Sequence, residues 1–525
     1  MHLRLRLRLR LRNLKLASER GFTTVTLMGV LMVGGLLVAA GFAAVDPDIS
    51  LSREDQDSKQ AYGAAESGLQ WYLSALARDN NYYLKCTEVP PPNASEAAPV
   101  NNVWTGAGTR KWRKLPGEQA EYTIELIPAP GKPVCSIPDQ FSMVDPFGNM
   151  RLRATGRSRG EYRSIVATLR RRNFIDFIYF TDFETLDPAA YSNPTTMTPR
   201  CSRYRAERAG QGCTEIQFAD DDDVLGPLHT NDNVLICGQP QFGRTPRDTI
   251  VINGPPNQGF ISNCGGSSAN VQGTLDQPAG TLGMPPSNRA LRDVAIEQGT
   301  HRYLGYTVIE LNGANMLVTN FKAFGDNLPH AVAWPAKGVV YVENDPTQGG
   351  CTAGYDRSND YSTQQPGCGD LWIKGSYGGD LTVAADNDVV VNGHISRSVD
   401  GLLLGLIANN FVRVYHPVSD DCDDNRTGYL PNLTIQAAIL ALNHSFIVDN
   451  WACGDPAGTL NVEGAIAQKF RGPVGTGGSS GISSGYLKNY VYNDRLRYRE
   501  PPYFLDPVHA QWRIARQNEQ IPAQN

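Results

Sequence analysis

The chain has 525 residues, too many for one ordinary hydrophobic core, so we expect two or three folding units. Only 19% of the residues are charged, while 52 glycines and 34 prolines are typical of a β-rich, turn-rich exported protein and argue against a helical bundle. Residues 1–21 carry seven Arg or Lys against one Glu, so the rest of the chain has a formal net charge of −11, although the whole chain has −5. This acidic body excludes nucleic acid as a partner, because nucleic-acid binding needs clustered basic residues.

The first predicted element is a membrane helix. Residues 22–45 are an apolar run without a charged residue. At 1.5 Å per residue these 24 positions reach roughly 36 Å, more than the roughly 30 Å of a hydrocarbon core. We therefore predict a basic cytoplasmic leader over 1–21, a transmembrane helix over 22–45, and an extracytoplasmic body anchored by this single pass. The alternative is a secretory signal that is cleaved at the small residues near Ala44.

An amphipathic helix is predicted over 46–77. Asp46-Pro47-Asp48 predicts a bend at its start, because proline removes a backbone hydrogen bond and crowds the preceding turn. Apolar residues then recur at spacings of three and four, which indicates one buried helix face: Ala61, Ala65, Leu69, Leu73 and Leu76.

Residues 78–175 are predicted to form a compact β head. Residues 122–127 alternate between apolar and polar side chains, as do 150–155 and 163–169 on either side of a turn at 158–161. We expect a small antiparallel sheet that packs against the helix of 46–77. Together they form an α+β module.

Residues 185–525 are predicted to form a second, mainly-β domain. Short β-branched runs such as 248–254, 388–393 and 460–464 end in Asn-Gly or Glu-Gly. This repetition favours a parallel β-solenoid of the β-helix kind, in which successive coils add similar strands to shared sheets. A β-sandwich with long loops is the alternative.

Ten cysteines fall into neighbouring pairs along the chain, and none precedes Cys86. No CxxC occurs, so neither a zinc knuckle nor a thioredoxin-like redox motif is indicated. In an exported chain this pattern predicts up to five local disulfides, with several buried free thiols as the alternative. The pairs are Cys86 and Cys135, Cys201 and Cys213, Cys237 and Cys264, Cys351 and Cys368, and Cys422 and Cys453.

Chemical motifs are sparse. The sequence has no HExxH, GxSxG or Walker-type loop, and we predict neither an enzyme nor a cofactor. His229 and His444 are interpreted as structural residues, and the acidic run 220–223 as a solvated loop. The candidate Ca²⁺ ligands are the hard carboxylates Asp420, Asp421, Asp423 and Asp424, which lack EF-hand spacing, so a solvated loop is the alternative here as well.

The junction Arg20-Gly21-Phe22 and the apolar run after it resemble the N-terminal signal of type IV prepilins and pseudopilins. The resemblance implies that a prepilin peptidase cuts between Gly21 and Phe22 and that Phe22 is then methylated. Thr26 occupies the fifth mature position, where major pilins carry Glu, which implies a minor or tip subunit. Residues 60–69 resemble the corresponding segment of PilX-like minor pilins. Residues 436–507 resemble the C-terminal signature of large, uncharacterised prepilin-like surface proteins.

The expected function is therefore that of a minor or tip type IV pilin-like or pseudopilin-like surface protein. It would be membrane-anchored before assembly and display a large β domain for adhesion. The partners that this implies are prepilin peptidase, pilin or pseudopilin subunits, the membrane and an unidentified surface ligand. One alternative is a membrane-anchored structural cell-envelope protein outside any filament. Another is a glycan-acting β-helix enzyme, which clustered carboxylates and a basic residue in one groove would favour.

Overall fold

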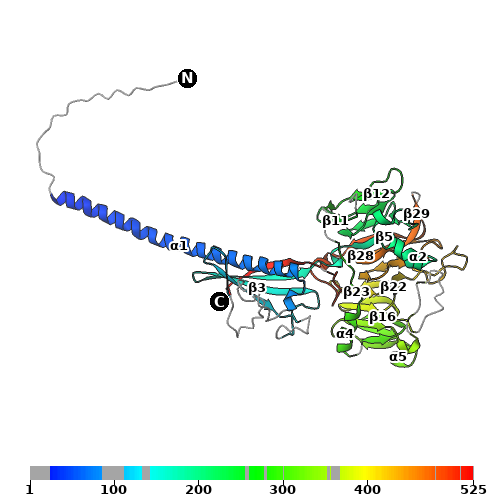
Figure 1. Cartoon of the computed structure of the whole chain (residues 1–525). Coiled ribbons are helices and arrows are strands. Elements are labelled where there is room, and N and C mark those ends of the chain that lie inside the picture. The colour runs from blue at the N-terminus through cyan, green and yellow to red at the C-terminus, as the bar shows by residue number, and fades with distance from the viewer. Residues whose placement is uncertain are drawn as a thin grey trace, which may run out of the picture.

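The structure is a computed structural model that describes residues 24–84, 112–132, 142–254, 259–276, 281–299, 301–349, 351, 355, 367–478, 481–508 and 510–523, with the side chains of 40–52 left out. Gly21, Phe22, Cys86 and Cys135 lie outside the described residues, as does the basic leader. A long helix and a small sheet form a head, and a larger β body follows (Figure 1).

The helix α1 spans Thr24–Arg78 and continues through Pro47, where a bend was expected. Its second half lies against the head sheet (Figure 1). Small residues allow this close approach: a Cβ added to Gly156 of the sheet would lie 1.9 Å from the carbonyl oxygen of Ala61 and 2.6 Å from the amide nitrogen of Ala65. The helix and the sheet therefore meet backbone to backbone, and the larger residues Leu69, Tyr72 and Leu76, further along the helix, fill the core.

The head sheet has five strands in the described part of the chain, in the order β1-β2-β3-β4-β31, and every pair is antiparallel. Its last strand comes from the far end of the sequence, which was expected to belong to the 185–525 body. The chain thus leaves the head after β4, builds the whole body, and returns to complete the head. The strands are β1 (Arg113–Lys114), β2 (Glu121–Ile127), β3 (Asn149–Ser158), β4 (Glu161–Arg171) and β31 (Trp512–Gln520).

Trp512 fixes the returning strand in the head. Its ring lies edge-on to the Tyr83 ring with centroids 5.7 Å apart, and its indole N–H donates to the carbonyl of Asn80 at 2.9 Å. The Arg171 guanidinium lies 4.8 Å from the Trp512 ring. Because Trp512 is buried, β31 is held by a hydrophobic contact as well as by the backbone hydrogen bonds of its pairing with β4.

The body is dominated by one curled sheet of 23 strands among the described residues. Its pairs are parallel apart from the β16–β17–β18 and β29–β30 hairpins. Its strands are β5 (Tyr179–Leu186), β7 (Asp223–Leu225), β8 (Leu228–Thr230), β10 (Gln241–Phe242), β11 (Thr249–Ile252), β13 (Asn270–Val271), β14 (Thr274–Leu275), β15 (Arg302–Leu304), β16 (Thr307–Gly313), β17 (Asn315–Thr319), β18 (His330–Ala333), β19 (Val339–Glu343), β20 (Leu371–Tyr377), β21 (Leu381–Ala385), β22 (Val389–Arg397), β23 (Leu404–Ala408), β24 (Val412–Val414), β25 (Thr434–Ile435), β26 (Ala438–Ala441), β27 (Phe446–Val448), β28 (Pro456–Arg471), β29 (Gly475–Gly478) and β30 (Gly481–Tyr492).

Short elements complete the body. A separate parallel sheet consists of β6 (Gln217–Phe218), β9 (Val234–Ile236) and β12 (Phe260–Ser262). The remaining helices are brief: α2 (Pro194–Cys201), α3 (Arg205–Arg208), α4 (Arg289–Glu297) and α5 (Phe321–Phe324), with the 3-10 turns η1 (Tyr82–Leu84), η2 (Phe174–Asp176), η3 (Pro188–Ala190), η4 (Pro346–Gln348) and η5 (Asp494–Arg497).

The expected fold class, an α+β module followed by a separate β-solenoid or β-sandwich domain, is wrong. The protein is mostly β, with its described strands concentrated in one curled 23-stranded sheet, and the helices α2 to α5 have only four to nine residues. The reason is the short β-branched runs between glycine and asparagine turns, which leave no room for longer helices. The body is also not a separate C-terminal unit, because β31 returns to the head.

The strands of the body do not stack in chain order. The neighbours along one side are β14, β11, β8, β5, β28, β26, β23, β21, β19 and β15. The chain enters in the middle at β5 and winds outward to β14. It then crosses to the opposite end at β15 and winds back to β28 (Figure 1). Here we call the line along which β28 and β30 pair with β5 and β7 the seam.

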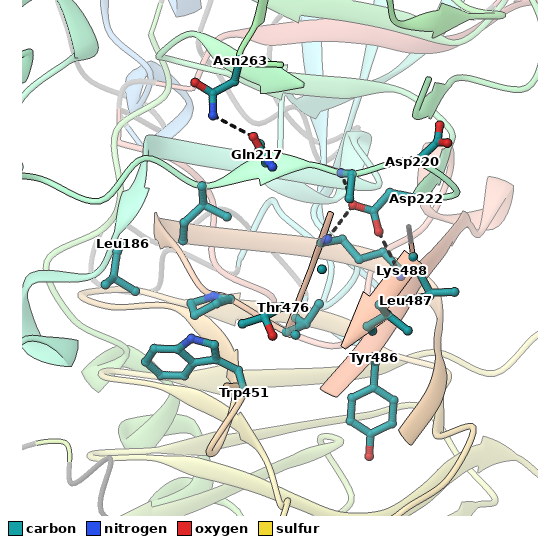
Figure 2. Close-up of a pocket in the computed structure, with 18 of the residues that line it drawn as sticks. Leu186, Gln217, Asp220, Asp222, Asn263, Trp451, Thr476, Tyr486, Leu487 and Lys488 are labelled. Atoms are coloured by element: carbon teal, nitrogen blue, oxygen red, sulfur yellow. Dashed lines mark hydrogen bonds and ion pairs between the residues drawn. The ribbon is translucent and has the colours of Figure 1, made fainter. Parts of the chain in front are cut away.

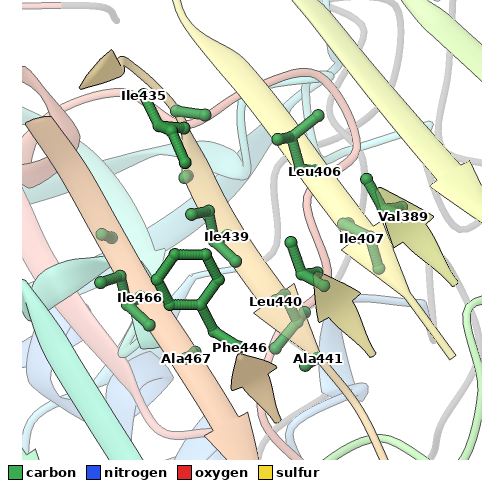
Figure 3. Close-up of a cluster of buried hydrophobic side chains, with 14 of the residues drawn as sticks. Val389, Leu406, Ile407, Ile435, Ile439, Leu440, Ala441, Phe446, Ile466 and Ala467 are labelled. Carbon is green, nitrogen blue, oxygen red and sulfur yellow. The ribbon is translucent and has the colours of Figure 1, made fainter. Parts of the chain in front are cut away.

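The core is built from side chains that repeat in register across the coils. Leu406 of β23 pairs with Ile439 of β26, which pairs with Ile466 of β28 (Figure 3). Ile466 then pairs with Tyr179 of β5 across the seam. β23 and β26 are buried along their whole length. Residues 501–504 cover part of the outer face of β23, where Gly405 lies against Phe504 and Pro501.

The predicted single-pass membrane anchor at 22–45 is wrong. No helix among the described residues is long and apolar enough to cross a membrane. The predicted localisation, a single-pass membrane protein with an extracytoplasmic body, depended on this anchor and is wrong as well.

Candidate functional site

Four of the expected disulfides are present. They join Cys201 to Cys213, Cys237 to Cys264, Cys351 to Cys368, and Cys422 to Cys453, with Cα atoms 4.3–5.7 Å apart. The first encloses the loop that carries α3, and the second ties the turn after β9 to the segment after β12. They staple loops at the edge of the curled sheet, so they are structural rather than catalytic.

The candidate calcium ligands lie in an exposed loop. Asp420 forms an ion pair with Arg426, and the backbone amides of Asp423 and Asp424 donate to the Ser419 hydroxyl at 3.1 and 2.9 Å. No group of three or more His, Cys, Asp or Glu side chains in the described part of the chain is arranged to hold a metal ion. The loop is therefore organised by its own hydrogen bonds and by Arg426.

Both histidines singled out in the sequence are held by neighbouring side chains: His229 is buried, and the partly buried His444 pairs with Asp187 at 3.0 Å. His229 of β8 is fully buried against the rings of Phe177 and Phe180, and its Nε2 lies 3.2 Å from the side chains of Asn231 and Asn253. Burial, followed by the charge of Arg172, lowers the pKa of His229 to about 3, so it is neutral at physiological pH. His444 stacks on Phe411 with centroids 4.4 Å apart.

A carboxylate cluster occupies one corner of the stacked coils. Arg413 pairs with Asp388 at 3.2 Å and with Asp449 at 2.9 Å. Asp370 accepts from the Asn387 side chain at 2.6 Å and from the Asp388 amide at 3.2 Å. Asn410 continues this ladder by donating to Asn387 at 2.6 Å. The acidic groups are thus hydrogen-bonded to backbone amides and stacked asparagines or paired with Arg413. The cluster therefore holds neighbouring coils together.

Asp370 makes the stability of the body pH-dependent. Burial, followed by repulsion from Asp388, raises the pKa of Asp370 to about 7. Between its ordinary pKa and pH 7, the folded chain holds a proton that the unfolded chain releases. Stability should therefore fall as the pH rises through this window, by up to about 1.4 kcal/mol per pH unit, and level off above it. In Asp370→Asn, which keeps the acceptor oxygen, this slope should become shallower in unfolding midpoints measured between pH 5 and 8.

Asp420→Asn is the matched control, because the Asp420 side chain is 94% exposed and this variant should keep the slope of the parent chain. An Asp370→Asn slope equal to that of the parent would contradict the role of Asp370.

A cavity of about 340 Å³ opens at the seam. One wall comes from residues 214–222, before β7, and the other from 473–477 and 481–488, which include parts of β29 and β30. Figure 2 shows Gln217 and Asn263 on one side of this cavity, Trp451 and Tyr486 on the other, and Asp222 with Lys488 at one end. The cavity therefore exists only because two segments far apart in sequence meet at the seam.

An ion pair across the seam forms the polar end of the cavity. The Lys488 ammonium lies 2.6 Å from Asp222 Oδ2, and its side chain is only 13% exposed. Asp222 Oδ2 also accepts from the Ala219 amide at 2.8 Å. Burial lowers the pKa of Lys488, and the charge of Asp222 opposes this shift.

A second ion pair crosses the seam behind the first. Arg471 of β28 donates to Glu184 of β5 at 3.0 Å, and its guanidinium lies 3.7 Å from the Phe218 ring centroid. Both charged side chains are buried, and burial raises the pKa of Glu184 while Arg471 opposes that shift. The Arg471 charge also contributes to the lowered pKa of Lys488. The two pairs form one charged layer where the halves of the body join.

Sequence reasoning missed this cavity. The run 220–223 was interpreted as a solvated loop, but Asp222 is buried and its partner lies 266 residues away. A single lysine in the long β-rich segment 481–492 is the only local signal. The expected site residues that the structure describes lie elsewhere: Thr26 is on α1, and neither the eight described cysteines nor the 420–424 loop lines the cavity.

No protein-family model and no curated protein matches the chain. Among solved structures, it is similar to the competence-associated pilin ComZ from Thermus thermophilus, with 13% identical residues and a TM-score of 0.29. The similarity covers 89% of this chain and 98% of that one.

Proposed function

We propose that the chain is a pilin-like surface protein, a minor or tip component that docks beside pilin or pseudopilin subunits through α1 and presents its β body for adhesion. The observation that carries this proposal is the first part of α1. It projects beyond the head sheet (Figure 1), and its large apolar side chains are exposed. Leu31 is 67% exposed and Met32 71%. A continuous apolar helix surface of this kind marks an interaction site in a folded protein.

The division of labour along the chain supports the same proposal. The second half of α1 is spent on the head core, so only the first half is available to a neighbouring helix. The β body lies at the opposite end of the head from the projecting helix (Figure 1). Thr26 supplies no carboxylate at the position where major pilins carry one, which supports a subunit of low copy number.

Processing tests this proposal. Co-expression with a prepilin peptidase should shorten the chain by its 21 leader residues and leave Phe22 as the new N-terminus, as measured by mass spectrometry of the intact protein. A Gly21→Ile control should keep the leader, because a bulky side chain replaces the glycine at the expected cut. An unprocessed parent chain, or one cut near Ala44, would contradict the pilin role.

A further inference from the structure

We propose that the seam cavity binds a neutral sugar residue, stacked on Trp451 and hydrogen-bonded by Lys488 and the amides of Gln217 and Asn263. The inference deepens the surface role proposed above, because it names the chemistry that the β body would recognise. It is argued from the groups that face the cavity and from the hydrogen bonds they leave unmade.

The Lys488 ammonium is the first of these groups. It has three N–H donors, and one of them bonds to Asp222. No other acceptor for Nζ lies within hydrogen-bond distance among the described residues. A largely buried ammonium that lines an open cavity thus has two donors to offer to an oxygen atom inside it.

The rim offers both a donor and an acceptor. Asn263 donates through Nδ2 to Gln217 Oε1 at 2.7 Å, which fixes the two amides side by side (Figure 2). In the described structure, this bond leaves Gln217 Nε2 without an acceptor and Asn263 Oδ1 without a donor. A hydroxyl group both donates and accepts, so neighbouring hydroxyls on one ring satisfy such a pair.

The charges around the cavity select a neutral ligand. Glu215, Asp220 and Asp222 all line it, so a free anion would meet three carboxylates. A cation would meet the Lys488 ammonium, and two of the carboxylates are already paired, Asp222 with Lys488 and Glu215 with Arg208. A polyhydroxylated neutral molecule avoids both penalties and still uses the polar atoms.

The apolar wall gives the ligand its shape. Trp451 lies across the cavity from the two amides in Figure 2. An indole face packs well against the C–H face of a pyranose ring, and the ring hydroxyls then point outward toward polar partners. An apolar wall with a few placed polar groups is the usual design of a small-molecule site.

The purified full-length chain tests the proposal directly. Saturation-transfer NMR with methyl α-glucoside, methyl β-galactoside, methyl α-mannoside and N-acetylglucosamine should show transfer from the protein to at least one of them. Trp451→Ala should weaken that binding about tenfold, which corresponds to about 1.4 kcal/mol. Asn263→Ala, on the exposed rim, should weaken it as well. Tyr498→Ala is the matched control, because Tyr498 is 71% exposed and does not line the cavity.

The outcomes are decisive. Binding of one sugar that Asn263→Ala weakens, together with Trp451→Ala where that variant folds, supports the proposal. It is overturned if none of the four sugars binds, if these variants bind as tightly as Tyr498→Ala, or if butylamine or acetate binds the cavity more tightly than any sugar. This binding assay needs no peptidase, so a failure here leaves the processing result unchanged, and a failure of processing leaves this result unchanged.

Discussion

Deletion of residues 512–525 is expected to unfold the head while the coils of the body remain folded. The deletion removes β31, which pairs with β4 from Arg171 to Ser164, and exposes the edge of β4. It also removes Trp512, whose truncation to Ala alone should cost about 3–5 kcal/mol because the side chain is 8% exposed. The lost pairing adds to this, and the total approaches the 5–15 kcal/mol that stabilises a typical domain.

Hydrogen exchange followed by mass spectrometry measures this effect region by region. Backbone amides of β3 and β4 should lose protection in the deletion variant, and those of β23 and β26 should keep it. Ile521→Ala is the control, because Ile521 is 83% exposed just after β31 and its side chain supports neither sheet. Full protection of β4 in the deletion variant would show that the head is complete without its returning strand.

Glu184→Leu is expected to destabilise the body by about 3–5 kcal/mol. The substitution leaves the buried Arg471 guanidinium without its carboxylate partner at the seam. The remaining contacts of Arg471, with the Ile216 carbonyl at 3.2 Å and with the Phe218 ring, do not neutralise its charge. The midpoint of urea unfolding, followed by tryptophan fluorescence, reports the loss.

The double variant Glu184→Leu/Arg471→Met tests whether the unpaired charge causes this loss of stability. It removes both charges and fills the space with apolar side chains, so it should recover most of the lost stability. Glu297→Ala serves as the matched control: it removes one member of an exposed ion pair with Lys337, which should cost no more than about 1 kcal/mol. If the double variant were as unstable as the sum of the two single variants, the pair would not be what joins the two coils.

Local patterns in the sequence predict local structure. The alternating runs 122–127, 150–155 and 163–169 lie within β2, β3 and β4, because each places its apolar side chains in the head core. Cysteines separated by 12–31 residues are bonded as neighbours, since each pair closes one loop at the edge of the body. These features depend on a few adjacent residues and are visible without a structure.

The arrangement of the strands could not be predicted in the same way. Ile466 pairs with Tyr179 although nearly the whole body lies between them in the sequence. No local periodicity specifies the register between segments so far apart along the chain. The candidate site suffers for the same reason, because Asp222 is an ordinary acidic residue until Lys488 is placed beside it. The predicted fold class is wrong for the same reason. The strand-like runs predict coils that stack in chain order, but they do not indicate at which coil the chain enters the stack.

The late closure of both sheets has a consequence for synthesis. On the ribosome, β5 and β7 emerge early, but the strands that cover their open edges, β28 and β30, are translated nearly 300 residues later. The edge of β4 stays uncovered for longer still, because its partner β31 is translated last. A product that terminates prematurely therefore presents uncovered strand edges in both halves of the molecule, the feature by which proteases and chaperones distinguish unfinished chains from finished ones.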